Sequence, residues 1–222
     1  MTFGALKDTI TEYLTLEGWT NTSTPPVTAD LANAALAQFS WMAEYIRGSA
    51  DITMVAGTNL YSLTATTADA WARISACAFT DGSGQLERTS EEVLSVDEPT
   101  WFVAASGSPR LYWSPKPGFI RVYPTPASSG KVLRVVGARC EPTLSATDGA
   151  FLAPLPFHDA IAQLGAALHA QKYAVSEAQQ SRVALWKSNA SDAALALKAT
   201  MMSDRLPFAR RLSLQGTPRV RV

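Results

Sequence analysis

The side chains of this chain best suited to metal or acid–base chemistry are two histidines. His158 and His169 are eleven residues apart, close to three helical turns, so a helix would place both on one face. Their separation along it would be about 16 Å, too far for both imidazoles to bind one metal ion. A zinc site needs three or four ligands, and the sequence has no Cys-x-x-Cys or Cys/His ligand set. We therefore expect surface or helix-capping histidines, with no metal and no cofactor.

The other polar clusters do not form a recognisable catalytic set. His158 and Asp159 are adjacent, and adjacent residues of a helix point in different directions. The sequence has no Gly-x-Ser-x-Gly elbow, no Walker loop and no Gly-x-Gly-x-x-Gly fingerprint. The acidic pairs Glu91-Glu92 and Asp97-Glu98 flank a short predicted helix, and we interpret them as solvated charges. We therefore expect no catalytic residues and a protein that is not an enzyme.

Four aromatic residues, Trp71, Trp101, Tyr112 and Trp113, fall in a region rich in strands and turns. One interpretation is a platform on which sugar rings stack. The other is the core of a β-domain, where aromatic rings supply much of the buried area. Aromatic residues are ordinary in strands, which favours the core, so Trp71 and Trp101 are predicted to be buried. Trp113 alternates with Tyr112 and is the ring that remains a candidate for exposure.

Hydrophobic periodicity predicts four long helices, two near each end of the chain. They span residues 2–17, 28–47, 156–173 and 177–202. Thr2 and Thr28 are suited to cap the first two helices, and Ser176 with Gln179 forms a capping box for the last.

The second predicted helix has a broad apolar face, because Trp41 and Tyr45 lie beside its main stripe. The stripe consists of Leu31, Ala35, Phe39, Met42 and Ile46. A face this broad suggests burial on two sides, against its own domain and against a neighbouring molecule.

Residues 51–140 favour strands and turns. We expect a hairpin of residues 52–55 with 60–63, a turn at 81–84, and a short helix that begins after Ser90. The further predicted strands cover residues 71–79, 85–88, 101–104, 110–113, 119–123 and 132–138. In the last of these, Leu133 and Val135 face one way and Arg134 the other. Short strands with frequent turns indicate a small sandwich or barrel.

The predicted fold class is therefore α+β: a helical bundle with an inserted β-sandwich or barrel-like domain and an extended C-terminal arm. Residues 1–50 and 146–202 supply the two halves of the helical domain, 51–145 the β-rich insertion, and 203–222 the arm. The two helix pairs are expected to pack together, because neither pair alone buries enough surface.

The composition is that of a globular protein. The 222 residues are 47% hydrophobic and 17% charged, with zero net charge, so the chain as a whole is not a polycation that seeks nucleic acid. No apolar stretch approaches the ~20 residues that span a bilayer, and we see no secretory signal, so we expect no membrane and a reducing cytoplasm. Cys77 and Cys140 are expected to pack as small buried apolar residues.

Charge is distributed unevenly along the chain. Residues 1–60 hold two basic and six acidic residues, whereas residues 151–222 hold nine basic and four acidic. Such polarity suits a subunit that meets different partners at its two ends, although chance variation explains it equally well.

The arm interleaves basic and apolar residues. These are Arg205, Leu206, Phe208, Arg210, Arg211, Leu212, Leu214, Arg219 and Arg221. Pro207 and Pro218 forbid a continuous helix. The interleaving favours docking on a protein surface over binding nucleic acid, and a solvated tail is the third interpretation.

The order and spacing of several short motifs resemble a known family. They are Tyr61-Ser62-Leu63, Leu86, Trp101, Gly107-Ser108-Pro109, Tyr112, Ile120-Arg121-Val122-Tyr123-Pro124-Thr125-Pro126, the strand Val132 to Val136, Pro142, Leu144 and Leu155-Pro156. In this order they resemble head–tail adaptor, or connector, proteins of tailed bacteriophages, including tail tubular proteins. The resemblance covers about residues 50–200, and no single motif in it is specific.

The resemblance implies a structural subunit of a ring, dodecameric in that family, at the head–tail junction of the virion. Its partners would be the portal protein, the tail nozzle, tube or spike, and further copies of itself. Genome DNA would pass through the channel without sequence-specific binding, and the subunit would reside in the host cytoplasm during assembly. The arm would dock onto the portal. The candidates for the ring interface are Phe39, Trp41, Tyr45 and Trp186.

Two rival functions remain. A carbohydrate-binding or receptor-binding virion module would expose coplanar aromatic rings and bind sugar as a monomer. An enzyme with an unrecognised site would have a pocket with converging polar groups.

Overall fold

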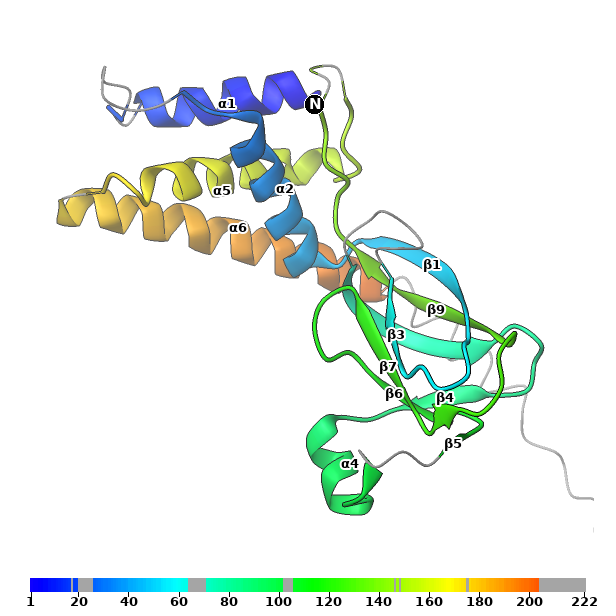
Figure 1. Ribbon diagram of the computed structural model, residues 1–222. Helices are drawn as coiled ribbons and strands as arrows, with labels where there is room; N and C mark the ends of the chain where they lie inside the picture. The colour runs from blue at the N-terminus through cyan, green and yellow to red at the C-terminus, as the bar shows by residue number, and fades with distance from the viewer. Residues whose placement is uncertain are drawn as a thin grey trace, which may run out of the picture. The chain divides into compact units, whose positions relative to one another are not determined.

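The computed structural model describes residues 1–16, 18–19, 26–63, 71–101, 106–145, 147, 149–174 and 176–203. The chain separates into two compact units, Met1–Tyr45 with Leu144–Val222, and Ile46–Thr143. We call them the helical unit and the β-unit. In the described residues the fold is mixed α+β, with five α-helices and a curled, half-barrel-like sheet (Figure 1).

Helix α5 is the centre of the helical unit. The four long helices of this unit are α1 (Phe3–Leu16), α2 (Ala29–Ala43), α5 (His158–Ala170) and α6 (Glu177–Ser203). Helix α5 contacts the other three, and 10 of its 13 residues are buried. A Cβ added at Gly165 would lie 2.5 Å from Cδ1 of Ile10 and 3.5 Å from Cβ of Ala35. Glycine at this position therefore lets α5 approach α1 and α2 closely.

The predicted helix starts are confirmed by their caps. Thr2 Oγ1 accepts a hydrogen bond from the Ala5 N–H at 3.2 Å, and Thr28 Oγ1 accepts one from the Leu31 N–H at 3.3 Å. At the start of α6, the Gln179 N–H donates to Ser176 Oγ at 3.3 Å, and the Ser176 N–H donates to Gln179 Oε1 at 3.2 Å. Helix α5 follows a short 3₁₀-helix, Leu155–Phe157, with proline near its first position.

The predicted extension of the second helix to residue 47 is wrong. Helix α2 ends at Ala43, because Glu44 adopts a left-handed conformation with φ of 48° and its N–H donates to the Ser40 carbonyl. The Glu44 carboxylate accepts a hydrogen bond from Lys198 Nζ on α6 at 2.8 Å, and its side chain is only 11% exposed. Ile46, predicted to continue the helical stripe, instead begins the first strand of the β-unit.

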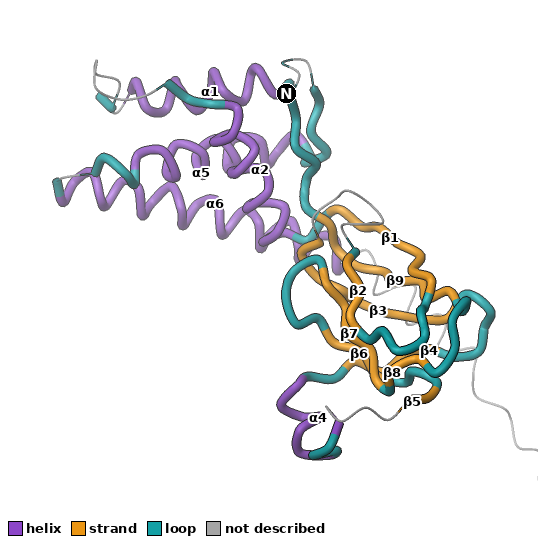
Figure 2. Tube along the Cα trace, viewed as in Figure 1, coloured by secondary structure: helices purple, strands orange, loops and turns teal. Residues whose placement is uncertain are grey.

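The β-unit contains one seven-stranded sheet in the order β1-β9-β3-β4-β6-β7-β2, and β5 pairs separately with β8. The strands are β1 (Ile46–Thr53), β2 (Leu60–Ser62), β3 (Trp71–Phe79), β4 (Gln85–Arg88), β5 (Ser106–Gly107), β6 (Leu111–Trp113), β7 (Phe119–Tyr123), β8 (Thr125–Pro126) and β9 (Val132–Arg139). The sheet turns a corner at β4, where Leu86 pairs with Cys77 of β3 and Arg88 pairs with Tyr112 of β6. Figure 2 shows the strands as a curved layer.

The core of the β-unit lies inside this curl. Leu133 and Val135 of β9 are buried, whereas Arg134 is exposed, which confirms the predicted alternation. Trp71 is 2% exposed and belongs to the same core. The predicted strand 71–79, its turn and its return strand are confirmed as the antiparallel β3–β4 hairpin.

The predicted hairpin of residues 52–55 with 60–63 is wrong. Ile52 in β1 pairs with Leu133 of β9, and Tyr61 in β2 pairs with Ile120 of β7. The turn between the two strands exists, with Gly57 at φ of 75° and a hydrogen bond from the Thr58 N–H to the Val55 carbonyl. The two strands that flank this turn therefore pair with different strands, which lie far along the sequence.

Two further expectations fall partly or wholly beyond the described residues. Of the predicted strand 101–104, only Trp101 lies among the described residues. Its N–H donates to the Glu98 carbonyl in a turn. The C-terminal arm, after Ser203, lies entirely outside the described residues.

Candidate functional site

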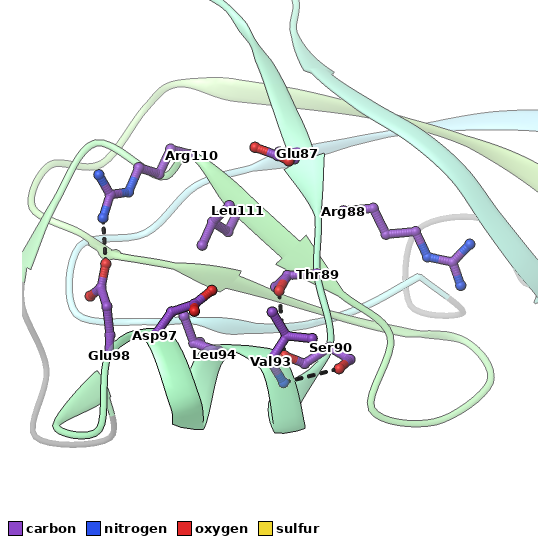
Figure 3. Close-up of a pocket in the computed structure, with 10 residues that line it drawn as sticks. All are labelled: Glu87, Arg88, Thr89, Ser90, Val93, Leu94, Asp97, Glu98, Arg110 and Leu111. Carbon is purple, nitrogen blue, oxygen red and sulfur yellow. Dashed lines mark hydrogen bonds and ion pairs between the residues drawn. The ribbon is translucent and has the colours of Figure 1, made fainter.

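A hollow of about 640 Å³ in the β-unit lies between helix α4 (Glu91–Asp97) and strands β4 and β6. We call it the α4 groove. Figure 3 shows Glu98 and Arg110 joined at one end and Ser90 bonded to the Val93 N–H at the other. Its lining residues are Glu87, Arg88, Thr89, Ser90, Val93, Leu94, Asp97, Glu98, Arg110 and Leu111.

The charges in the α4 groove fasten the helix to the sheet. The Glu98 carboxylate accepts hydrogen bonds from the Arg110 guanidinium, at 2.5 Å, and from the Tyr123 hydroxyl. The bond to Glu98 raises the pKa of Tyr123. Ser90 caps α4, as predicted, and its hydrogen bond lowers the pKa of the exposed Glu92 carboxyl. These groups form hydrogen bonds with one another within the β-unit, and they do not pair a nucleophile with a base.

The aromatic rings of the β-unit pack inward. Trp71 and Tyr112 belong to the main core, and Trp113 packs with Leu94 and Tyr123 beneath α4, so the suggested exposure of Trp113 is wrong. Trp101 is half-buried rather than buried: its ring meets Trp113 edge-on at 5.6 Å, and its Nε1 donates to Ser95 Oγ at 3.1 Å. These four rings therefore do not present a coplanar surface to solvent.

The expectation that both histidines are surface or capping residues is wrong. His158 is buried, with its Nε2 2.8 Å from the Ala153 carbonyl and its ring tilted against that of Phe151, 4.5 Å between ring centroids. His169 is buried, and its ring is tilted against that of Tyr173, 5.5 Å between ring centroids. Burial lowers the pKa of both imidazoles. The cause is that α5 is enclosed by three helices, which its amino-acid pattern alone did not reveal.

No metal-ligand cluster was found in the part of the chain that the structure describes, where no three His, Cys, Asp or Glu side chains gather closely enough to hold an ion. Cys77 is buried, and burial raises the pKa of its thiol to about 12. Cys140 is half-buried.

The four candidate ring-interface residues divide into two groups. Phe39 and Tyr45 are buried and pack against each other, and Trp186 is buried edge-on against Tyr13 at 6.0 Å. Trp41, by contrast, is 55% exposed. It lies on the side of α2 away from the buried residues Ala35, Leu36 and Phe39.

Helix α6 exposes a second apolar surface that sequence reasoning missed. Its buried side includes Val183, Trp186, Ala190, Ala194 and Leu197. Three large apolar residues lie exposed on its other side, namely Leu185, Leu195 and Met202. The available signal was that the apolar residues of this helix fall on both of its sides.

A model of the SU10 adaptor protein family matches residues 1–214, which is nearly the whole chain. The chain belongs to this family. No curated protein matches the chain.

As a phage adaptor protein, the chain is a structural component of the virion that interacts with head and tail components. None of the helices in the described ranges is long and apolar enough to cross a membrane. The nine apolar and arginine residues of the adaptor's arm that the sequence singles out lie outside the described residues.

Proposed function

We propose that this adaptor chain is one subunit of a closed ring that joins the portal to the tail of a tailed phage, with genome DNA passing through the central channel. The observation that carries the proposal is the match to the SU10 adaptor family over residues 1–214. The ring itself is inferred from the resemblance of about residues 50–200 to connector proteins, which form dodecameric rings.

The surface chemistry supports the proposal. Exposed Trp41 on α2 and the exposed leucines of α6 are large apolar groups of the kind that protein interfaces bury. Glu98 and Arg110, which line the α4 groove, bond to other residues of the β-unit, which fits a structural role for this pair.

The arm fits the contact with the portal. A segment without its own core gains order by docking on a partner, and arginine can bond carboxylates bidentately there. The apolar anchors would be Leu206, Phe208, Leu212 and Leu214, and the arginines would pair with acidic or backbone groups of the portal.

Electron-microscopic imaging of the purified chain, alone and with portal protein, tests the ring. Closed rings with a central hole are expected in at least one of the two samples. A chain that stays monomeric and binds neither portal nor tail protein contradicts the proposal. Sugar binding by such a monomer would favour the receptor-binding alternative.

A further inference from the structure

The α4 groove contains carboxylates that no other part of the described chain neutralises. Glu87 on β4 and Asp97 on α4 are exposed, and neither carboxylate forms a hydrogen bond or an ion pair with another described residue. Figure 3 shows Glu87 on the strand side of the groove and Asp97 on the helix side, with the Arg88 side chain pointing away from both. Among the acidic residues that line the groove, Glu98 alone is held in an ion pair, with Arg110. The groove therefore presents two carboxylates that a cation of another molecule can reach.

The helix beside the groove adds to this negative charge. Glu91 and Glu92 are exposed on the first turn of α4, so residues 87–98 hold five acidic side chains and one arginine. Arg110 balances the carboxylate of Glu98 alone. An excess of like charge on one surface attracts a partner of the opposite charge and repels phosphate groups. The partner that suits this surface is therefore basic, and it is not nucleic acid.

Apolar side chains also line the groove. Val93 is 52% exposed, Leu111 is half-buried and Leu94 is buried. The methylene stem of a lysine or arginine packs on such side chains while its charged head stays beside carboxylates. A volume of about 640 Å³ suits a few side chains of one segment rather than a broad interface. The groove thus fits one segment that carries both basic and apolar side chains.

A buried donor beside the groove lacks an acceptor. Trp113 is 4% exposed, and its Nε1 has no hydrogen-bond partner among the described residues. It borders a second hollow, of about 230 Å³, which shares Arg88, Thr89 and Ser90 with the α4 groove and is also lined by Glu91. A buried N–H without an acceptor is costly, and the carbonyl of a bound peptide would satisfy it. A peptide segment with a basic side chain supplies both the acceptor and the cation, which a metal ion does not.

We propose that the α4 groove is the docking site for a basic, partly apolar segment of a tail protein. The inference rests on the proposed function, in which the chain contacts the portal, the tail and its own copies. The arm, which is itself basic, is the proposed contact with the portal, and the exposed apolar residues of the helical unit suit contacts between copies. The tail is the component that these assignments leave without a surface, and the acidic groove of the β-unit offers it one.

Substitutions that remove charge test the groove. The probe is each tail protein of the phage, purified separately. A full-length chain with Glu87→Gln and Asp97→Asn should bind the tail protein at least about tenfold more weakly than the unmodified chain. The matched control carries Asp8→Asn and Glu12→Gln, which remove two exposed carboxylates from α1 of the helical unit, and it should bind as tightly as the unmodified chain. The affinity of the unmodified chain should fall as salt rises, and that of the groove variant should fall less.

Trp113→Phe tests the indole donor separately, because it removes the N–H and keeps an aromatic ring beneath α4. It should weaken binding to the tail protein about fivefold, which corresponds to the loss of one hydrogen bond. Circular dichroism at the temperature of the binding assay verifies that this variant and the groove variant are folded.

Hydrogen exchange then identifies the partner. The backbone N–H groups of α4 should exchange more slowly when the tail protein is present, and portal protein should leave their exchange unchanged. Slower exchange with portal alone assigns the groove to the portal, and slower exchange on ring formation without either protein assigns it to a second copy. Either result overturns the proposal.

A groove variant that binds the tail protein as tightly as the unmodified chain also overturns it. These results leave the binding of the unmodified chain to portal and tail intact, so the proposed function survives. An unmodified chain that binds none of the tail proteins overturns the proposed function and the docking site together.

Discussion

Gly137 shows how strongly one residue of the β-unit is constrained. It lies in β9 between β1 and β3, and a Cβ at this position would be 2.1 Å from the Arg73 carbonyl oxygen and 3.0 Å from the Trp71 ring. The obstructing atom at 2.1 Å belongs to the backbone, so it cannot move without displacing β3. The absence of a side chain is therefore what allows Trp71 to cover this part of the sheet.

Gly137→Ala should lower the free energy of unfolding by roughly 3 kcal/mol or more, because it overpacks a core bounded by backbone. Urea denaturation measures the change. Gly107→Ala is the matched control, because its Cβ would meet Pro124 at 3.7 Å, an ordinary contact. A Gly137→Ala variant as stable as this control would show that the backbone of β3 shifts to accommodate the added methyl group at little cost in stability.

His169 couples the helical unit to pH. Burial, and then the charge of Lys172, lowers the pKa of its imidazole in the folded protein. The unfolded chain therefore binds the proton more tightly than the folded chain. Stability is complete above the unfolded pKa of about 6.5 and is lost as pH falls from there through the folded pKa.

The unmodified protein should accordingly lose stability between neutral pH and about pH 5, and His169→Gln should lose less over the same interval. Thermal melts at a series of pH values measure the slopes. His158 shifts in the same direction and still titrates in the variant, so part of the loss should remain. Identical slopes for both proteins would assign the acid sensitivity elsewhere.

At the scale of elements, the sequence predicted what neighbouring residues decide. The caps at Thr2, Thr28, Ser90 and Ser176 depend on a side chain and an N–H two or three residues away, and all four formed. The β3–β4 hairpin depends on a four-residue turn, and it formed as well.

Elements that depend on distant partners were predicted less well. Strand β2 was recognised as extended, and so was the end of β1 at residues 52–53. A local pattern does not specify whether the partner is the adjacent strand or one roughly 60 to 90 residues later. The end of α2 depends on Glu44, whose left-handed conformation accompanies an ion pair with Lys198. The hydrophobic periodicity of residues 28–47 does not predict the contact between Glu44 and Lys198.

The sequence does not show which of the candidate interface residues are exposed, for the same reason. The broad apolar face predicted for the second helix included Tyr45 and Ile46, which lie beyond the end of α2 at Ala43. Choosing among Phe39, Trp41 and Tyr45 required knowledge of which side of the helix meets α5 and α6. The structure leaves Trp41 exposed, and it adds the exposed apolar residues of α6.

At the scale of the whole molecule, a phage adaptor chain interacts with head and tail components, and in the proposed ring it also contacts its own copies. The helical unit supplies the proposed contacts between copies, so a further segment is needed for the portal. The arm after Ser203 is suited to that role, because it directly follows α6 and combines four apolar anchors with five arginines. Contact with packaged DNA is the competing explanation for the arginines, and a solvated tail is another.

Deletion of residues 204–222 should abolish or greatly weaken portal binding while the helical unit and the β-unit keep their melting behaviour. A second variant with Leu206, Phe208, Leu212 and Leu214 all changed to Ser keeps the arginines and removes the anchors, and it should also lose portal binding.

Binding is measured by sedimentation with purified portal at two salt concentrations. Docking through apolar anchors predicts a shallow dependence on salt, whereas contact with DNA predicts steep weakening of DNA binding as salt rises. Portal binding by the truncated chain as tight as that of the full chain would show that the arm serves another component or none, because the surfaces that remain would then suffice for the portal.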